Sequence, residues 1–305
     1  MKYKYSMKKG SILITVLIII TICTTVALFI HERAVSSYGT VIGLQYDYQG
    51  AIYAMTAIQA LEAAFKYDDK PYDSSESIWN QIPPIPVENG FLNAFIRPLN
   101  AKLPLAPLAI DNETVRERYV NGFNKLKDKL ELTECDTDRL IQWVGVGNPS
   151  TERFDESGSP YNIKSSQLQT LAELAYIPTF KNEYKKLSEY VSIAGDGNKI
   201  NLNVASEDVI TSLVPELEPY VKEIIEKREE EPLKNISDLY QIMGSSMQEV
   251  YSKILPYVDV KSSLFYAKLE LNIGDEFRYY HVLLQRNGKS VKPIKYIEGG
   301  NIEYF

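Results

Sequence analysis

The chain has 305 residues, 45% of them hydrophobic, and a net charge of −7, so it is long enough for two domains or one large one beyond an anchor. Four basic residues lie within the first ten positions, so the remainder is more acidic still, which argues against nucleic acid or anionic lipid as a partner. With only two cysteines and two histidines, we expect no disulfide framework, and a metal site or Ser/His/Asp triad that needs histidine would have to use His31 or His281.

The first predicted element is an apolar helix behind a short basic leader. Residues 11–30 contain no charge; fifteen are apolar and five are serine or threonine. As a helix this run is about 30 Å long, enough to cross the hydrocarbon of a bilayer. The lysines of residues 1–10 favour a cytoplasmic N-terminus, with the chain beyond residue 30 on the other side.

This stretch has three interpretations: a plain signal anchor, a cleaved secretory signal peptide, or a leader cut between Gly10 and Ser11 with the helix retained. A secretory signal requires a shorter apolar core and a small-residue cleavage site, whereas here the helical pattern continues. A basic leader that ends in glycine before a retained apolar helix resembles the signal of type IV pilins and pseudopilins. The plain anchor stays open, because such a leader also arises by chance.

The helical pattern continues beyond the membrane segment. Apolar residues recur three or four positions apart and predict one stripe, packed on a soluble domain. They are Val41, Leu44, Tyr48, Ile52, Met55, Ile58, Leu61 and Phe65. No proline occurs in residues 11–70, so we expect one long helix that ends near Tyr67.

Strand signals flank a long helical region. Residues 79–86 hold three prolines and predict an irregular connection. Alternating patterns predict two strands in residues 90–105 and three in residues 263–297, with a hairpin turn at Asn287–Gly288, and we expect all five in one sheet. Helices are predicted over residues 114–132, 136–144, 166–175, 180–189, 206–214, 219–229, 237–243 and 247–255. A faint repeat, Tyr190–Ile193 and Tyr257–Val260, suggests two packed copies of a small helical hairpin.

One segment is similar to the helix-hairpin-helix units that bind DNA. It opens with Asn201, Leu202 and Asn203, turns at Pro215 and contains Arg228 in its second helix. In DNA-binding units, hairpin glycines let backbone N–H groups approach a phosphate. The hairpin of residues 215–219 has no glycine, and residues 207–231 contain nine acidic against three basic residues, so phosphate is repelled. We interpret the unit as a packing module; a membrane-anchored DNA receptor is the alternative.

In their order, these features resemble the K-type minor pseudopilins of type II secretion, the general secretion pathway protein K family. The resemblance spans nearly the whole chain and includes the leader, the phrase Asn201–Asn203, residues 140–143 and residues 282–288. It implies an α+β fold: a pilin-like long N-terminal helix whose first half is transmembrane, a small antiparallel sheet, and a large all-α insertion of SAM-like helix-hairpins. The expected parts are a leader (1–10), a transmembrane half-helix (11–30), a pilin-like domain (31–105 and 261–305) and an inserted helical domain (106–260).

The resemblance also implies how the N-terminus is used. Prepilin peptidase would cut after Gly10 and methylate Ser11, which makes Thr15 the fifth mature residue. Most pilins and pseudopilins carry a glutamate there, paired with the terminal amine of a neighbouring subunit; the K type, at the filament tip, lacks it. An unpaired carboxylate at bilayer depth costs roughly 2.5–3.5 kcal/mol, whereas a threonine hydroxyl can bond to a carbonyl one turn earlier. Thr15 is therefore interpreted as a marker of the tip position, although it is also simply one of five hydroxyl residues in the span.

The function implied is structural. A single-pass inner-membrane subunit, with its C-terminal domain in the periplasm, would join minor pseudopilins of the I and J types, cap a type II secretion pseudopilus and start its assembly. A minor tip pilin of a related type IV pilus is an alternative. The chain shows no nucleophile elbow, no paired metal histidines and no Gly-rich phosphate loop, so we expect no enzyme.

No cofactor is expected. Some members of the family hold calcium, and the resemblance makes calcium possible here. Calcium needs six to eight oxygen ligands, usually several carboxylates. Residues 144–149 contain no acid, and the nearby Asp136, Asp138, Asp155 and Glu156 have no recognisable loop spacing, so no metal ligand is assigned.

Overall fold

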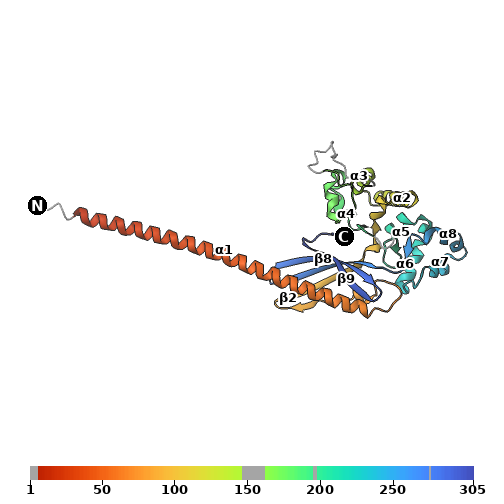
Figure 1. The fold of residues 1–305 in the computed structure, drawn as a ribbon, viewed down its shortest axis with the longest axis horizontal. Helices are drawn as coiled ribbons and strands as arrows, with labels where there is room; N and C mark the ends of the chain where they lie inside the picture. The colour runs from red at the N-terminus through yellow and green to blue at the C-terminus, as the bar shows by residue number, and fades with distance from the viewer. Residues whose placement is uncertain (1–5, 146–161, 195–197, 275) are drawn as a thin grey trace. The chain divides into compact units, whose positions relative to one another are not determined.

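The computed structural model describes residues 6–145, 162–194, 198–274 and 276–305, with side chains from Ile12 onward. The chain divides into two compact units, Met1–Tyr53 and Ala54–Phe305. Figure 1 shows the fold. The fold is α+β: one long helix, one antiparallel sheet and a helical region.

Helix α1 runs from Ser6 to Lys66 without a break, which confirms the predicted long helix. Its N-terminal part is long and apolar enough to cross a membrane, and the side chains there are exposed. Three hydroxyls in this part bond to the carbonyl one turn earlier: Thr21 to Leu17, Thr24 to Ile20 and Thr25 to Thr21, each at 2.8 Å. These three hydroxyls thus find acceptors within the helix, as a lipid environment would require.

The sheet of the second unit has the order β1-β2-β7-β8-β9, and every neighbouring pair is antiparallel. The strands are β1 (Ile85–Val87), β2 (Gly90–Pro98), β7 (Leu264–Ile273), β8 (Glu276–Asn287) and β9 (Ser290–Gly299). One face packs against the end of α1, where Phe65 meets Phe265 edge to face with ring centroids 4.7 Å apart. Strands before and after the helical region therefore form one sheet, as predicted.

The predicted strands were wrong in two places. The proline-rich segment before residue 90 supplies strand β1. Because β1 lies at the edge of the sheet, it tolerates a proline, which cannot donate a backbone hydrogen bond to a neighbouring strand. The predicted strand at residues 101–105 leaves the sheet after a 3₁₀ turn (Leu99–Ala101). Only β3 (Leu103–Pro104) remains of it, paired in parallel with β4 (Val191–Ser192).

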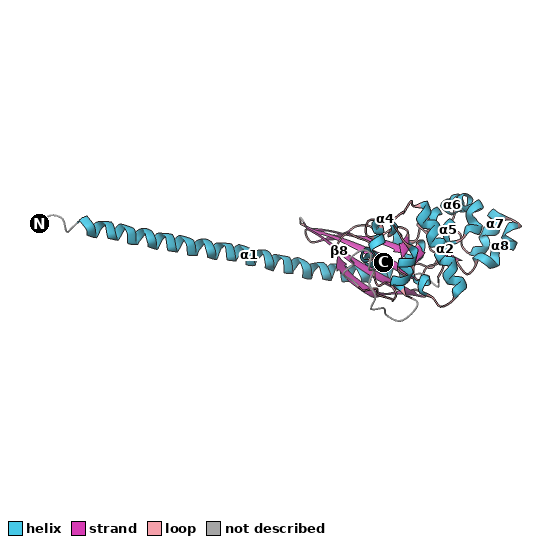
Figure 2. Cartoon of the chain, turned by 90° about the horizontal axis from the view of Figure 1, so that it is seen from above, coloured by secondary structure: helices cyan, strands magenta, loops and turns pink. Residues whose placement is uncertain are grey.

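The helical region lies between β2 and β7 in sequence and extends from the sheet (Figure 2). Its α-helices are α2 (Glu113–Lys129), α3 (Thr137–Val144), α4 (Tyr184–Leu187), α5 (Glu207–Leu213), α6 (Val221–Glu230), α7 (Tyr240–Met243) and α8 (Ser246–Ile254), and its 3₁₀ turns are Ala106–Ala109, Leu171–Tyr176, Pro178–Phe180, Pro215–Tyr220 and Ile236–Leu239. The helices predicted at 166–175 and 180–189 are largely 3₁₀ turns and the single turn α4. A capping box of Thr170 and Glu173 delays the first until Leu171, and Pro178 interrupts the chain before the second.

The repeat is visible in the backbone pairing. β4 pairs with β3, and β6 (Val258–Asp259) pairs with β5 (Ile200–Asn201), both in parallel. The equivalent bonds, from the amide of Leu103 to Tyr190 and from that of Ile200 to Tyr257, are both 2.9 Å long. Each copy thus begins and ends with strands that pair with each other.

Candidate functional sites: an exposed helix face and a buried joint

Helix α1 carries two different apolar faces, where one stripe was predicted. On the first, five side chains are 46–71% exposed: Val41, Leu44, Tyr48, Ile52 and Met55. On the second, Ala54, Ala57, Leu61 and Phe65 are at most 2% exposed. At about 100° per residue, the centres of these faces lie on the order of 130° apart around the helix. The prediction of a single stripe is therefore wrong, because the two sets of side chains lie on different sides of the helix; the packing of Val41–Met55 on the soluble domain stays a prediction. The first face is an apolar surface of the kind that binds partners.

The N-terminal residues singled out from the sequence all lie in α1. Gly10 and Ser11 fall in the part of the helix whose side chains are not described. Thr15 is exposed on the helix surface. Cleavage, methylation and the role of Thr15 stay predictions.

The residues of the hairpin module come together around one asparagine. The side chain of Asn203 pairs with the backbone of Leu233 in both directions, donating to its carbonyl and accepting from its amide at 2.9 Å each. Arg228 on α6 donates from Nη1 to the carbonyls of Leu202 and Ala205, both at 2.6 Å. Its guanidinium therefore holds the strand-to-helix connection from inside the unit, instead of facing outward as a phosphate ligand would.

Two further residues of the module lie away from this centre. Pro215 begins the 3₁₀ turn that joins α5 to α6. Asn201 is fully buried, and its side-chain amide donates to the carbonyl of Asp73 (3.2 Å) and to the hydroxyl of Ser262 (3.0 Å). Asn201 thus belongs to a second cluster, which joins the module to the sheet.

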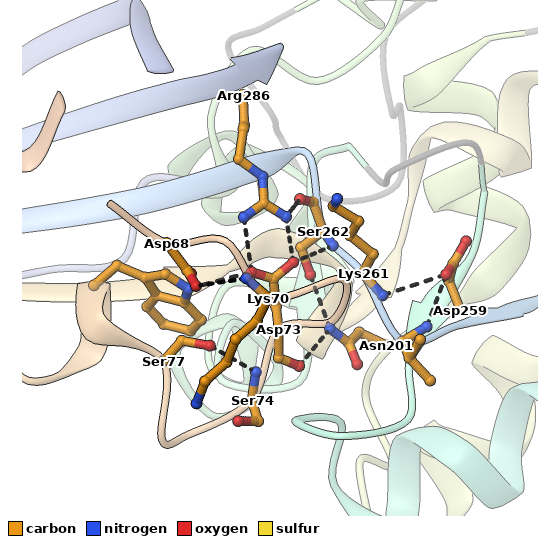
Figure 3. Close-up of polar contacts among 12 residues, drawn as sticks. Asp68, Lys70, Asp73, Ser74, Ser77, Asn201, Asp259, Lys261, Ser262 and Arg286 are labelled. Carbon is orange, nitrogen blue, oxygen red and sulfur yellow. Dashed lines mark hydrogen bonds and ion pairs between the residues drawn. The ribbon is translucent and has the colours of Figure 1, made fainter. Parts of the chain in front are cut away.

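That second cluster is centred on Asp73, in the loop after α1 (Figure 3). The carboxylate of Asp73 is fully buried and accepts two hydrogen bonds from the guanidinium of Arg286 on β8, one of them 2.8 Å long. It also accepts from the amide of Ser262 at 2.7 Å and from the indole of Trp79 at 3.3 Å. A buried carboxylate with this many donors is well compensated for its loss of hydration.

The cluster fastens three parts of the second unit to one another. Asp73 comes from the loop after α1, Arg286 from the sheet, and Asn201 from the helical region. Asn100, just after β2, completes it by accepting from the hydroxyl of Ser262 at 2.6 Å. The sequence did not predict this joint, because its members are spread over residues 73–286 and none of them lies in a recognisable local motif.

The described residues offer no metal site: among them, no group of three His, Cys, Asp or Glu side chains lies close enough together to hold an ion. Asp136 is used as the cap of α3, accepting from the amides of Asp138 (2.9 Å) and Arg139 (3.4 Å). Asp155 and Glu156 lie outside the described residues. The expectation of no metal stays a prediction.

Comparison with known proteins gives a likeness in fold. No family model matches the sequence, and no curated protein matches it significantly. Among solved structures, it is similar to a chain of the GspK–GspI–GspJ complex from the type 2 secretion system of enterotoxigenic Escherichia coli. The match has a TM-score of 0.68 and 16% identity and covers 84% of this chain and 98% of the other. The protein therefore has a GspK-like, pseudopilin-like fold.

Proposed function

We propose that the protein is a minor pseudopilin of the K type, which caps the tip of a type II secretion pseudopilus and initiates its assembly. The observation that carries this proposal is the GspK-like fold with a helical region of residues 99–263 inserted between two adjacent strands of the pilin-type sheet. The similar structure is a complex with two other pseudopilins, which supports partners of the I and J types for this chain. The role is structural, without catalysis.

The exposed face of α1 is the surface on which we place these partners. Its five apolar side chains lie beyond the proposed membrane segment (residues 11–30) on the same helix, α1, through which the subunit would join a filament. Burial of such a stripe against a second helix removes apolar area from water at roughly 25 cal/mol per Å². The subunit would thus dock sideways through α1, in the inner membrane and just outside it.

The identity of residue 15 supports the proposed position at the tip of the filament. In a filament, a glutamate at this position would be stabilised by the terminal amine of a neighbour; Thr15 offers no carboxylate to recruit one. The N-terminus would lie in the cytoplasm and the second unit in the periplasm, as the leader lysines favour. The DNA-receptor alternative is disfavoured, because Arg228 points into the unit and the surrounding surface is acidic.

Processing of the leader tests the proposal. The full chain is expressed with and without prepilin peptidase, and the mature N-terminus is sequenced. We expect a chain that begins at methylated Ser11 only when the peptidase is present. A Gly10→Val chain is the matched control and should keep its leader in both strains. A wild-type chain that keeps residues 1–10 beside an active peptidase would remove the basis of the proposal.

A further inference from the structure

The face of the sheet that points away from α1 carries exposed aromatic side chains. Successive residues of a strand point to opposite faces, so Phe265, which meets Phe65 of α1, marks the covered face, and its neighbour Tyr266 lies on the other. Three exposed rings of β2 and β8 share this second face with Tyr266. They are Phe91, Phe95 and Phe277, which are 43%, 55% and 56% exposed. Large apolar side chains grouped on one surface mark a binding site.

Polar groups separate these rings. In the register of the sheet, Asn272 on β7 lies between Phe91 and Phe277. Along β2, Asn93 lies between Phe91 and Phe95 on the same face. Within the described part of the chain, the side-chain amides of both asparagines make no hydrogen bond. Each amide can therefore donate to and accept from a ligand that lies across the rings.

A cavity of about 240 Å³ opens on this face beside Phe95. Its walls include Tyr266, which is 1% exposed, and Arg97, whose guanidinium carbon lies 4.9 Å from the centre of the Tyr266 ring. A concave site with aromatic walls and a few polar groups is typical of small-ligand sites. The cavity thus continues the binding surface at one end of the group of exposed rings.

The charges of this cavity cancel in pairs. Two cations and two carboxylates line it. The guanidinium of Arg97 contacts the carboxylate of Glu303, and Nζ of Lys268 lies 2.8 Å from a carboxylate oxygen of Glu270. An ionic ligand would have to displace one of these partners, whereas a neutral ligand can donate to the carboxylates and accept from the cations. The cavity is therefore suited to neutral groups that both donate and accept, as hydroxyls do.

We propose that the cavity and the three exposed rings together bind a neutral, extended saccharide chain. The faces of sugar rings carry C–H groups that pack on aromatic rings by dispersion, and sugar hydroxyls both donate and accept hydrogen bonds. Phe91 and Phe95 are four residues apart, about 13 Å along an extended strand, so the site spans several sugars. The inference does not depend on the pseudopilin function.

A protein partner fits this face less well. The ion pair of Lys268 and Glu270 lies on the central strand β7, between the rings of β2 and β8. Interfaces between proteins are depleted of charged residues at their centre, where apolar side chains form a continuous surface. Rings set apart by amides and an ion pair match a ligand that alternates C–H faces with hydroxyls.

Calorimetric titration of the full chain tests the proposal, in a detergent without a sugar headgroup. The probes are cellohexaose and N-acetylchitohexaose, which are neutral, extended β-1,4-linked chains, and maltohexaose, a neutral α-1,4-linked chain that coils. We expect at least one extended chain to bind at least about tenfold more tightly than maltohexaose, which corresponds to 1.4 kcal/mol. The tighter of the two extended chains identifies the sugar. Added salt should leave the affinity unchanged, because a neutral ligand has no charge to screen.

An exposed ring provides a variant that should fold normally. Phe95→Ala removes the ring beside the cavity, and we expect the affinity for the extended chain to fall about tenfold or more. Tyr67→Ala removes an exposed ring outside this face and is the matched control, which should bind as wild type does. Both variants should unfold at the wild-type urea midpoint.

Four results would each overturn the proposal: no binding of either extended chain, equal or tighter binding of maltohexaose, binding that weakens with salt, or wild-type affinity in Phe95→Ala. A wild-type dimer that Phe95→Ala dissociates would assign the face to a second copy of the chain instead.

Discussion

Asp73 and Arg286 are 213 residues apart in sequence, yet they form the most buried ion pair among the described residues. The pair is compensated by the amide of Ser262 and the indole of Trp79, so neither charge is left without hydrogen bonds. Breaking one side of such a pair leaves a dehydrated charge, which is far costlier than losing an exposed pair. We therefore regard the Asp73 joint as the polar centre of the second unit.

Removal of the Asp73 charge should be strongly destabilising. Asp73→Asn leaves the guanidinium of Arg286 buried without its counter-ion, and we expect the free energy of unfolding to fall by about 3–5 kcal/mol. The measurement is urea denaturation of the full chain in detergent. The matched control is Asp69→Asn, which breaks the exposed pair of Asp69 with Lys289 and should cost about 1 kcal/mol or less. Equal, small losses in both variants would contradict this account of the joint.

His281 makes stability depend on pH. Its ring is fully buried on β8; Nδ1 lies 2.5 Å from the hydroxyl of Tyr266, and Nε2 donates to the carbonyl of Gly300 at 2.9 Å. Burial lowers the pKa of His281 to about 4, and nearby Lys268 acts in the same direction. The folded chain therefore keeps this ring neutral at pH values where the unfolded chain protonates it.

The sign of the effect follows from this difference in pKa. Between pH 6.5 and pH 4 the unfolded state binds more protons at His281, so stability falls as pH is lowered, by about 2 kcal/mol from pH 7.5 to pH 5. The comparison is between wild type and His281→Gln, unfolded with urea at both pH values. The variant should lack this part of the acid loss. Identical pH dependence in the two chains would show that His281 does not titrate in this way.

At the scale of elements, the features that the sequence predicted well are those set by nearby residues. The helix predicted from residue 114 begins at Glu113, where Asn112 caps α2 by accepting from the amide of Val115, and the predicted turn Asn287–Gly288 joins β8 to β9, with a positive φ of 63° at Gly288. Both signals lie within four residues of the structure they produce. Strand β1 and the pairing of β3 with β4 escaped prediction, because their partners are chosen by the tertiary fold.

The faces of α1 show the same limit. Spacing alone joins Val41 and Phe65 into one stripe, because each step of three or four residues tolerates some drift around the helix. Over seven steps the drift becomes a change of face. The Asp73 joint could not be predicted from the sequence for a different reason: no local pattern marks residues that come together only after folding.

The exposed face of α1 should affect assembly without affecting stability. Tyr48→Glu places a charge in the centre of this face, and we expect co-purification with the I- and J-type subunits to fall at least about tenfold, for a loss of 1.4 kcal/mol or more. Gln49→Glu is the matched control, because the next residue points about 100° away, and it should bind as wild type does. Both variants should unfold at the wild-type urea midpoint. Full co-purification of Tyr48→Glu would remove this face from the interface.

At the scale of the whole molecule, the chain combines a helix that is long and apolar enough to cross a membrane with a second unit whose sheet is interrupted by a helical insertion. The sheet closes across residues 99–263, because β2 pairs with β7 along nine residues, from Gly90 to Pro98. The insertion is tied back to the sheet by the Asp73 joint, and again by the segment after β9, where the amide of Leu171 donates to the carbonyl of Tyr304 at 2.8 Å. In the proposed cap, this insertion would occupy the space beyond the end of the filament, which a body subunit lacks.

The position of the subunit in the filament tests the central claim most directly. Pseudopili lengthened by overproduction of the major subunit are labelled with gold-conjugated antibody against the second unit and counted in electron micrographs. The account predicts label at one end of each filament and none along its length. Label spaced regularly along the shaft would show that the protein is a body subunit, and the proposal of a cap would be wrong.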